Sequence, residues 1–270
     1  MKKIIEKSIE VMENDLNHGS SWYMDKALEL LSLVEFKDLK NVIDRVISIR
    51  PMATLSNIAE VISKVKNDYE LKVAINRLKK YKSNANKSLK TYLKNLKIKV
   101  FVTISFSSAV LSLIKNSKID TVYLMESKPG NELDKAFTEY SKYSNVYIIP
   151  DSSICFFIQK SDAVVTGSDG IYKEYIVNKI GTKTLVECAT NLKHPVYAIC
   201  ESYKAGIESP SLDYFIDYTT FEKTLKIPLF EKVELKKINY LVTNIGIYKN
   251  PKNSTIYEIR NDFIRNNVVV

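Results

Sequence analysis

The sequence lacks several features that would assign a function at once. Among its 270 residues are only seven glycines, three cysteines and two histidines. Cys155, Cys188 and Cys200 stand in apolar contexts without CxxC spacing, so we predict buried reduced thiols rather than a disulfide framework or a zinc site. His18 and His194 are too scattered to form a metal site by themselves. We therefore expect no metal and no cofactor.

Long apolar runs and nucleotide-hydrolysis motifs are also missing. No window approaches 18 consecutive apolar residues, and the N-terminal residues lack the apolar core of a signal peptide. No Walker-type Gly-x4-Gly-Lys-Ser/Thr motif occurs, which argues against nucleotide hydrolysis by the P-loop route. The expectation from these absences is a cytoplasmic protein with no membrane span.

Positive charge is in excess. The chain has 40 Lys and Arg against 31 Asp and Glu, a formal net charge of +9, which permits attraction to nucleic acid or another acidic partner. Much of the excess lies in one lysine-rich run between Lys79 and Lys99. Such a run is typical of a solvated helix face. RNA or ribosome association through it is the weaker alternative, because no nucleic-acid motif accompanies it.

Residues 1 to about 95 carry apolar side chains at helical spacing. Leu55, Ile58, Ala59 and Ile62 fall on one stripe, and the segments on either side show similar stripes. These patterns predict a small N-terminal helical domain over residues 1–95.

From about residue 98 the pattern changes to short apolar runs separated by helix-like segments. The expected strands are 100–102, 121–124, 146–149, 163–165 and 196–199, and the expected helices are 107–115, 131–142, 152–159 and 184–192. This alternation predicts βαβ units and a parallel sheet covered on both faces. The fold class is therefore α/β, with the helical domain followed by a Rossmann-like C-terminal domain over residues 96–270 and a mainly parallel sheet. A standard dinucleotide site is not expected, because Thr103-Ile104-Ser105-Phe106-Ser107 stands where Gly-x-Gly-x-x-Gly would follow the first strand.

An acidic residue follows the expected strand 163–165. In Gly167-Ser168-Asp169-Gly170 the acid stands where that strand ends, and Asn178-Lys179 come just before a helix N-terminus suited to anions. The crevice outside strand carboxyl ends is where open α/β sheets bind ligands. The alternative is that Asp169 only caps a turn and Gly181 only permits a close approach.

Several segments, taken in order, resemble a known family. They are Gly19-Ser20-Ser21, Arg50-Pro51-Met52-Ala53, residues 103–107, Glu126-Ser127-Lys128-Pro129-Gly130, Asp151-Ser152-Ser153, Gly167-Ser168-Asp169, Asn178-Lys179-Ile180-Gly181-Thr182, Pro195-Val196-Tyr197 with Lys204, and residues 240–246. Together they resemble the alpha, beta and delta regulatory subunits of translation initiation factor 2B and the related sugar-phosphate isomerases. The resemblance implies a homodimer that pairs through the C-terminal domains, with higher oligomers also open, and translation initiation factor 2, particularly its alpha subunit, as partner.

The resemblance also bears on catalysis. The isomerases act on methylthioribose 1-phosphate or ribose 1,5-bisphosphate with a Cys and an Asp in one pocket. Asp169 matches their Asp, but Ser105 stands at the place of their Cys, and a serine hydroxyl needs an adjacent base that this turn does not supply. We predict that Cys155 is a buried structural thiol rather than a substitute.

Two further departures concern phosphate binding. His18-Gly19-Ser20 stands where the isomerases carry Arg-Gly-Ala, and Lys128 replaces the arginine of their Glu-x-Arg-Pro motif. The expected ligand-binding residues are Gly19, Ser20, Ser21, Arg50, Ser105, Ser107, Lys128, Asp169, Asn178, Lys179 and Lys204.

The resulting hypothesis is a non-catalytic protein, similar to the regulatory subunits, whose pocket is vestigial or senses a sugar phosphate or nucleotide. No catalytic residue is expected. The alternative is an aldose–ketose isomerase with altered chemistry, in which Asp169 acts as acid or base and Lys179 or Lys204 holds the phosphate.

Overall fold

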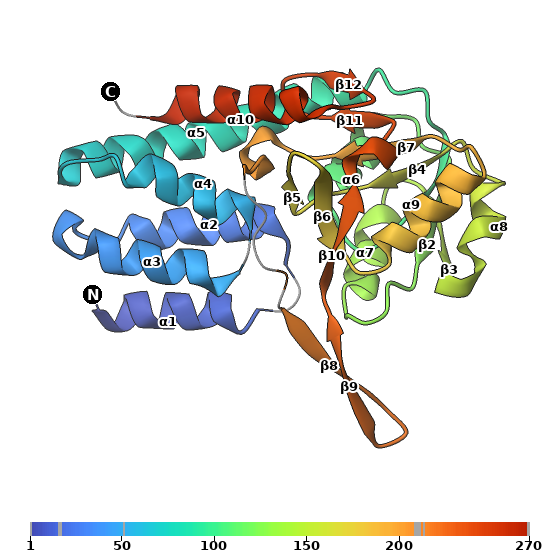
Figure 1. Cartoon of the computed structure of the whole chain (residues 1–270), viewed down its shortest axis with the longest axis horizontal. Coiled ribbons are helices and arrows are strands. Elements are labelled where there is room, and N and C mark those ends of the chain that lie inside the picture. Colours follow the sequence, from blue (N-terminus) through green and yellow to red (C-terminus); the bar gives the residue numbers. More distant parts are fainter. Residues whose placement is uncertain (1, 16–17, 51, 208–211, 213, 269–270) are drawn as a thin grey trace.

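The N-terminal third is helical, as the sequence predicts. A computed structural model of the chain describes residues 2–15, 18–50, 52–207, 212 and 214–268. Its first helices, stacked beside one another in Figure 1, are α1 (Lys2–Glu13), α2 (Ser20–Leu31), α3 (Leu39–Ile49), α4 (Ala53–Ile62) and α5 (Asp68–Leu93). Their apolar stripes meet in one core that includes Ile9, Leu28 and Ile58. Arg50, which follows α3, is extended, as expected of a residue before a proline; Pro51 itself lies outside the described residues.

The rest of the chain is built on a seven-stranded sheet with the order β12-β11-β7-β4-β1-β2-β3. The strands are β1 (Val100–Thr103), β2 (Thr121–Met125), β3 (Asn145–Ile149), β4 (Ala163–Thr166), β7 (Val196–Ile199), β11 (Tyr240–Val242) and β12 (Ile247–Lys249). All neighbouring pairs are parallel except β11 and β12. The predicted α/β class with a mainly parallel sheet is confirmed, and the strand order reverses between β1 and β4.

Apolar side chains cover both faces of this sheet. Val102 and Val164 belong to one core, whereas Phe101 and Val165 belong to a second. This is the alternation expected of strands buried on both sides. The helices that cover the faces are α6 (Ser108–Asn116), α7 (Leu133–Tyr140), α8 (Ile154–Ile158) and α9 (Thr182–Asn191).

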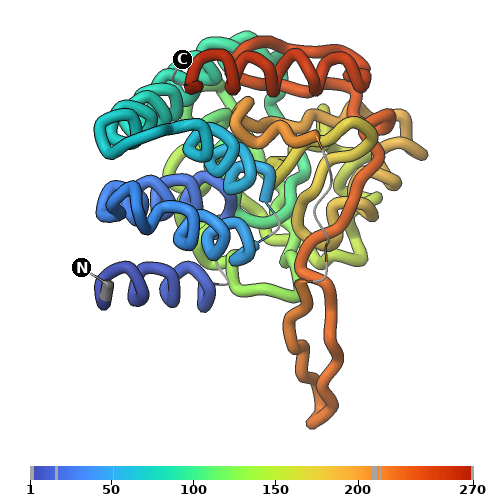
Figure 2. Tube along the Cα trace, turned by 60° about the vertical axis from the view of Figure 1, so that its left-hand side comes forward, coloured from blue at the N-terminus to red at the C-terminus, as the bar shows by residue number. Residues whose placement is uncertain are grey.

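Two antiparallel elements were not anticipated from the sequence. A small sheet joins β5 (Gly170–Ile171), β6 (Tyr175–Lys179) and β10 (Phe230–Glu234). A hairpin of β8 (Phe215–Thr220) and β9 (Lys223–Pro228) projects from the body of the molecule (Figures 1 and 2). Strands β6 and β10 are far apart in the sequence, so their pairing leaves no local signal.

Two helices tie the helical part to the sheet. In α5, Leu71 and Leu78 pack in the helical core, whereas Leu89 packs in one of the cores that cover the sheet. Helix α10 (Asn253–Asn267) lies beside α5 (Figure 1) and contributes Phe263 to the helical core and Ile259 to the sheet side. In the described part of the chain, no helix combines the length and the apolar character needed to cross a bilayer.

The cysteine prediction is wrong in two respects. Cys155 in α8 and Cys188 in α9 form a disulfide, with Cα atoms 5.7 Å apart, and the Cys155 residue is exposed rather than buried. These two helices pack against each other, a proximity that the sequence does not reveal. Cys200 is a buried free thiol, as predicted, and burial raises its pKa to about 12.

Candidate functional site

A cavity of about 330 Å³ lies where the N-terminus of α2 meets the turns that follow β1 and β4. It therefore opens at the point where the strand order reverses, which is the usual ligand position in an open α/β sheet. Ten of the expected site residues line it: Gly19, Ser20, Ser21, Arg50, Ser105, Ser107, Asp169, Asn178, Lys179 and Lys204.

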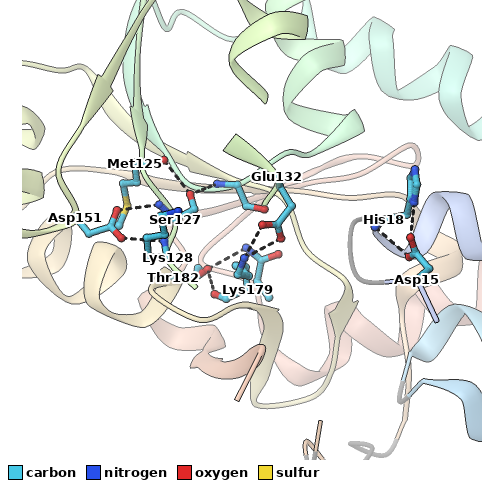
Figure 3. A network of polar contacts seen from close by, with 11 residues as sticks. Asp15, His18, Met125, Ser127, Lys128, Glu132, Asp151, Lys179 and Thr182 are labelled. Atoms are coloured by element: carbon cyan, nitrogen blue, oxygen red, sulfur yellow. Dashed lines mark hydrogen bonds and ion pairs between the residues drawn. The ribbon is translucent and has the colours of Figure 1, made fainter. Parts of the chain in front are cut away.

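Lys128 does not line this cavity, which corrects its place in the expected site. Its side chain is exposed and lines a separate hollow beside the hairpin, together with Phe215 and Lys226. Both backbone N–H groups of Ser127 and Lys128 donate to the Asp151 carboxylate, at 3.0 and 3.2 Å (Figure 3). These bonds fix the loop after β2 with the Lys128 side chain on the outside.

Ser105 occupies the turn after β1 in a left-handed backbone conformation, with φ of 61°. Its N–H donates to the Ser127 hydroxyl at 2.8 Å, and the buried Tyr140 hydroxyl accepts from the N–H of Ser107 at 2.8 Å. Side chains from two other elements thus hold a backbone shape that is unfavourable for serine. Among the described residues the Ser105 hydroxyl has no hydrogen-bond partner, so a ligand can use it.

Ser107 begins the next helix and lies against β4. Its hydroxyl accepts from the N–H of Val110 at 3.4 Å, at the N-cap of α6. A Cβ at Gly167 would lie 2.3 Å from that hydroxyl, so the β1 and β4 turns can approach this closely only because residue 167 has no side chain.

Asp169 joins the two halves of the molecule at the cavity. Its Oδ1 accepts from the N–H of Ser20 at 3.1 Å, and its carbonyl oxygen accepts from the Ser20 hydroxyl at 2.8 Å. The carboxylate therefore caps the N-terminus of α2, where a negative charge is favoured. Its Oδ2 makes no hydrogen bond with the described residues. Asp169 thus keeps one acceptor for a ligand while the other fixes the orientation of α2.

Asn178 is positioned by two threonines. Its amide nitrogen donates to the Thr166 hydroxyl at 2.9 Å and to the Thr182 hydroxyl at 3.0 Å, and the residue is buried. Thr182 follows Gly181, which has φ of 96° and forms the N-cap of α9. The amide oxygen has no partner in the described part of the chain. Asn178 therefore offers a fixed acceptor to a ligand hydroxyl.

Lys179 is bound by a carboxylate that the sequence analysis missed. Both oxygens of Glu132 lie 2.8 Å from Lys179 Nζ, and both residues are buried (Figure 3). Gly130 packs directly on this pair, because a Cβ there would lie 2.3 Å from Lys179 Nζ. The lysine expected to hold a phosphate is thus already neutralised within the protein.

Lys204 is paired in the same way. Its Nζ lies 3.0 Å from Glu201 Oε2, and both side chains are buried. Burial alone would lower the pKa of Lys204, but the attraction of Glu201 and Asp169 outweighs it and raises the pKa above 10.5. Lys204 therefore stays charged, with much of its field cancelled by Glu201.

Arg50 differs from these lysines. It is 1% exposed, yet its guanidinium carbon lies 4.8 Å from the Tyr23 ring centre and 4.7 Å from the Tyr214 ring centre. Its Nη2 donates to the Tyr214 hydroxyl at 3.1 Å, and its Nε has no hydrogen-bond partner in the described part of the chain. Burial raises the pKa of Tyr23, so that phenol stays neutral and is no counter-ion. Of the four buried cations in the described part of the chain, Lys82, Lys179 and Lys204 are paired with carboxylates and Arg50 is not.

His18, which lines the cavity, and its partner Asp15 were not among the expected ligand-binding residues. His18 Nδ1 lies 2.6 Å from Asp15 Oδ1, and its ring stacks on Trp22 with centres 4.6 Å apart. His18, Trp22 and Phe106 all line the cavity without filling it. Among the described residues, no group of three or more His, Cys, Asp or Glu side chains could hold a metal ion.

Comparison with known proteins gives consistent relatives. Residues 22–249 match the sequence profile of the Initiation factor 2 subunit family. Ribose 1,5-bisphosphate isomerase of Methanocaldococcus jannaschii is 28% identical over 242 residues, which cover 79% of this chain and 78% of that protein. The structure of translation initiation factor eIF-2B from Pyrococcus horikoshii OT3 aligns with a TM-score of 0.85 at 25% identity, covering 92% of this chain and 97% of that one. 5-Methylthioribose 1-phosphate isomerase from the same organism shares the fold, with a TM-score of 0.71 at 18% identity, covering 96% of this chain and 88% of that one.

Proposed function

Because the chain belongs to the Initiation factor 2 subunit family, as its motifs implied, we propose that its cavity binds a small sugar phosphate without isomerising it. The observation that carries this proposal is the buried guanidinium of Arg50, which has no carboxylate partner among the described residues. A buried charge of this kind is costly unless something neutralises it. The planar guanidinium fits two oxygens of a phosphate, and the rings of Tyr23 and Tyr214 hold it in place.

The size and the remaining lining favour a pentose phosphate over a nucleotide. A volume of about 330 Å³ lies at the lower end of the ~300–1,000 Å³ of small-molecule sites. Asp169 Oδ2 and the amide oxygen of Asn178 are acceptors for sugar hydroxyls, and the Ser105 hydroxyl both donates and accepts. The relative from M. jannaschii is named for a sugar bisphosphate, which agrees with this chemistry.

The absence of a thiol from the lining residues supports binding without turnover. Cys200 is buried and its raised pKa of about 12 keeps the thiol protonated, whereas Cys155 and Cys188 are joined to each other. None of the three lines the cavity. A protonated thiol or a disulfide is not a nucleophile. We infer a role like that of the regulatory subunits, in which ligand occupancy matters and chemistry does not.

The second candidate is an isomerase in which Asp169 transfers the proton. It is favoured by one arrangement, the carboxylate of Asp169 and the strained Ser105 lining the same cavity. Carboxylates in enclosed sites can act as acid or base.

One experiment separates the two candidates. Thermal-shift titrations with ribose 5-phosphate, ribose 1,5-bisphosphate and unphosphorylated ribose measure binding, and NMR of the bisphosphate mixture detects any ketose product. We expect stabilisation by the phosphorylated sugars only and no ketose. Turnover that Asp169→Asn abolishes would establish the isomerase instead. No stabilisation by any phosphorylated sugar would overturn the binding proposal.

The implied associations are part of the proposal. A homodimer through the C-terminal part, contact with the alpha subunit of translation initiation factor 2 and a cytoplasmic location stay predictions. Sedimentation of the purified protein and co-purification with that subunit would test the first two.

A further inference from the structure

The lysine-rich run has a structural property that the cavity does not explain. Residues 71–119 contain no Asp or Glu, although the whole chain has 31 of these acidic residues. Seven exposed lysines lie between the middle of α5 and the start of β1: Lys79, Lys80, Lys87, Lys90, Lys94, Lys97 and Lys99. We call these seven residues the lysine face.

The helical members of the lysine face lie on one side of α5. At about 100° per residue, Lys79, Lys80, Lys87, Lys90 and Lys94 fall within an arc of about 100°. The buried side of the helix, with Leu78, Leu89 and Leu93, lies on the other side. With a rise of about 1.5 Å per residue, the face is about 22 Å long between Lys79 and Lys94.

The charges of the lysine face are not neutralised within the protein. Some exposed lysines elsewhere form ion pairs, such as Lys37 with Glu35 and Lys142 with Glu139. In the described part of the chain no side chain of the lysine face forms an ion pair. The buried Lys82 does form one, with Asp25 at 2.6 Å, so the lysine that points inward is the one with a partner.

Two acids that touch this segment already accept hydrogen bonds. Asp162 accepts from the backbone N–H groups of Lys99 and Val100, at 2.8 and 2.9 Å. Asp262 of α10 accepts from the Tyr81 hydroxyl at 2.5 Å. Like charges three and four residues apart on a helix repel one another, and no described acidic side chain forms an ion pair with these lysines to offset the repulsion. A polyanion bound from outside the chain would offset this repulsion.

We propose that the lysine face binds the phosphate backbone of a nucleic acid, independently of the cavity. A face of about 22 Å spans about six phosphates of one duplex strand at ~3.4 Å each. The exposed residues between the lysines are neutral donors such as Ser83, Asn84 and Thr91. The aromatic residues of this segment, Tyr81 and Tyr92, use their hydroxyls in internal hydrogen bonds. Contacts to the backbone without base stacking predict binding that is independent of sequence.

The test measures binding and its salt dependence together. Fluorescence anisotropy follows a labelled single-stranded RNA of mixed sequence and a labelled DNA duplex between 50 and 300 mM salt. Five to seven phosphate contacts predict a slope of log K against log salt of about −4 to −5 for the single strand. The variant Lys87→Gln/Lys90→Gln/Lys94→Gln should lose affinity roughly tenfold or more and reduce the slope by about 2. Binding of both probes assigns the site to any phosphate backbone, and binding of one assigns it to that nucleic acid.

A matched control removes the same charge elsewhere. Lys3→Gln/Lys7→Gln/Lys40→Gln alters three exposed lysines of α1 and α3 that form no ion pair among the described residues. It should bind nucleic acid as the unaltered protein does. Equal weakening by both triple variants, binding that is insensitive to salt, or binding to anionic phospholipid vesicles but not to nucleic acid would overturn the proposal. Retained stabilisation by ribose 5-phosphate in both variants keeps this test separate from that of the cavity.

Discussion

Replacing Arg50 by methionine should separate ligand binding from stability. In the protein without ligand, the substitution removes a buried charge whose desolvation costs several kcal/mol. It also removes two ring contacts worth about 0.5–2 kcal/mol each and one hydrogen bond worth about 1 kcal/mol. These effects nearly cancel. We expect the free energy of unfolding to change by about 1 kcal/mol in either direction, or about 2–4 °C in Tm.

Ligand binding should respond far more strongly to the same change. A phosphate that accepts two hydrogen bonds from the guanidinium gains about 1.5–3 kcal/mol from each. Their loss should weaken ribose 5-phosphate binding by at least about a hundredfold. Calorimetric titration measures the affinity, and thermal melts without ligand measure the stability.

Arg45→Met is the matched control for this prediction. Arg45 is exposed and pairs with Glu6 across the surface, where ion pairs are screened by solvent, so its replacement should leave both stability and binding nearly unaltered. Wild-type affinity in Arg50→Met would refute the reasoning. So would a large loss of stability in the ligand-free variant, since that would mean the guanidinium is satisfied within the protein.

Three further predictions concern other pairs. Glu132→Gln leaves Lys179 buried without a counter-ion, so urea unfolding should show that the free energy of unfolding falls by about 3 kcal/mol, while the affinity for phosphate rises. The double variant Glu132→Leu/Lys179→Met should recover most of the stability. An unchanged urea midpoint in Glu132→Gln would contradict this prediction. Because the pKa of Lys204 is raised in the folded state, its contribution to stability is present below pH ~10.5 and lost as pH rises further. In Glu201→Gln burial prevails and lowers this pKa below 10.5, so the contribution of Lys204 should reverse sign and stability should rise as pH approaches 10.5, whereas superimposable alkaline unfolding curves would exclude this coupling. Thiol titration of the denatured, unreduced protein should find one reactive cysteine, Cys200, and three after reduction, so three before reduction would disprove the Cys155–Cys188 bond.

The sheet and most of its covering helices could be predicted because parallel strands buried on both faces are uninterrupted apolar runs. Segments such as 163–165 and 196–199 need no partner to be recognised as strands. Strands β6 and β10 carry polar residues such as Asn178 and Glu231, and they become strands by pairing with each other across about fifty residues of sequence. The β8–β9 hairpin is likewise polar on much of its surface and gave no clear apolar alternation.

The site residues could be predicted where they directly follow a strand of the parallel sheet. Ser105 follows β1 and Asp169 follows β4, and the carboxyl ends of parallel strands meet at one edge. Side-chain direction and pairing were not predictable. Lys128 follows β2 but points away from the cavity, and Glu132, a charged residue near a helix start, gave no sign that it would be buried on Lys179.

Helix α10 completes a core that begins with the first helices of the chain. Phe263 belongs to the core formed by α1 to α5, all of which precede it by more than 160 positions. At ~5–20 residues per second on the ribosome, about 10–30 s pass between the synthesis of those helices and the synthesis of Phe263. During synthesis the first third must therefore keep part of its apolar surface uncovered, and the step that closes it follows translation of residue 263.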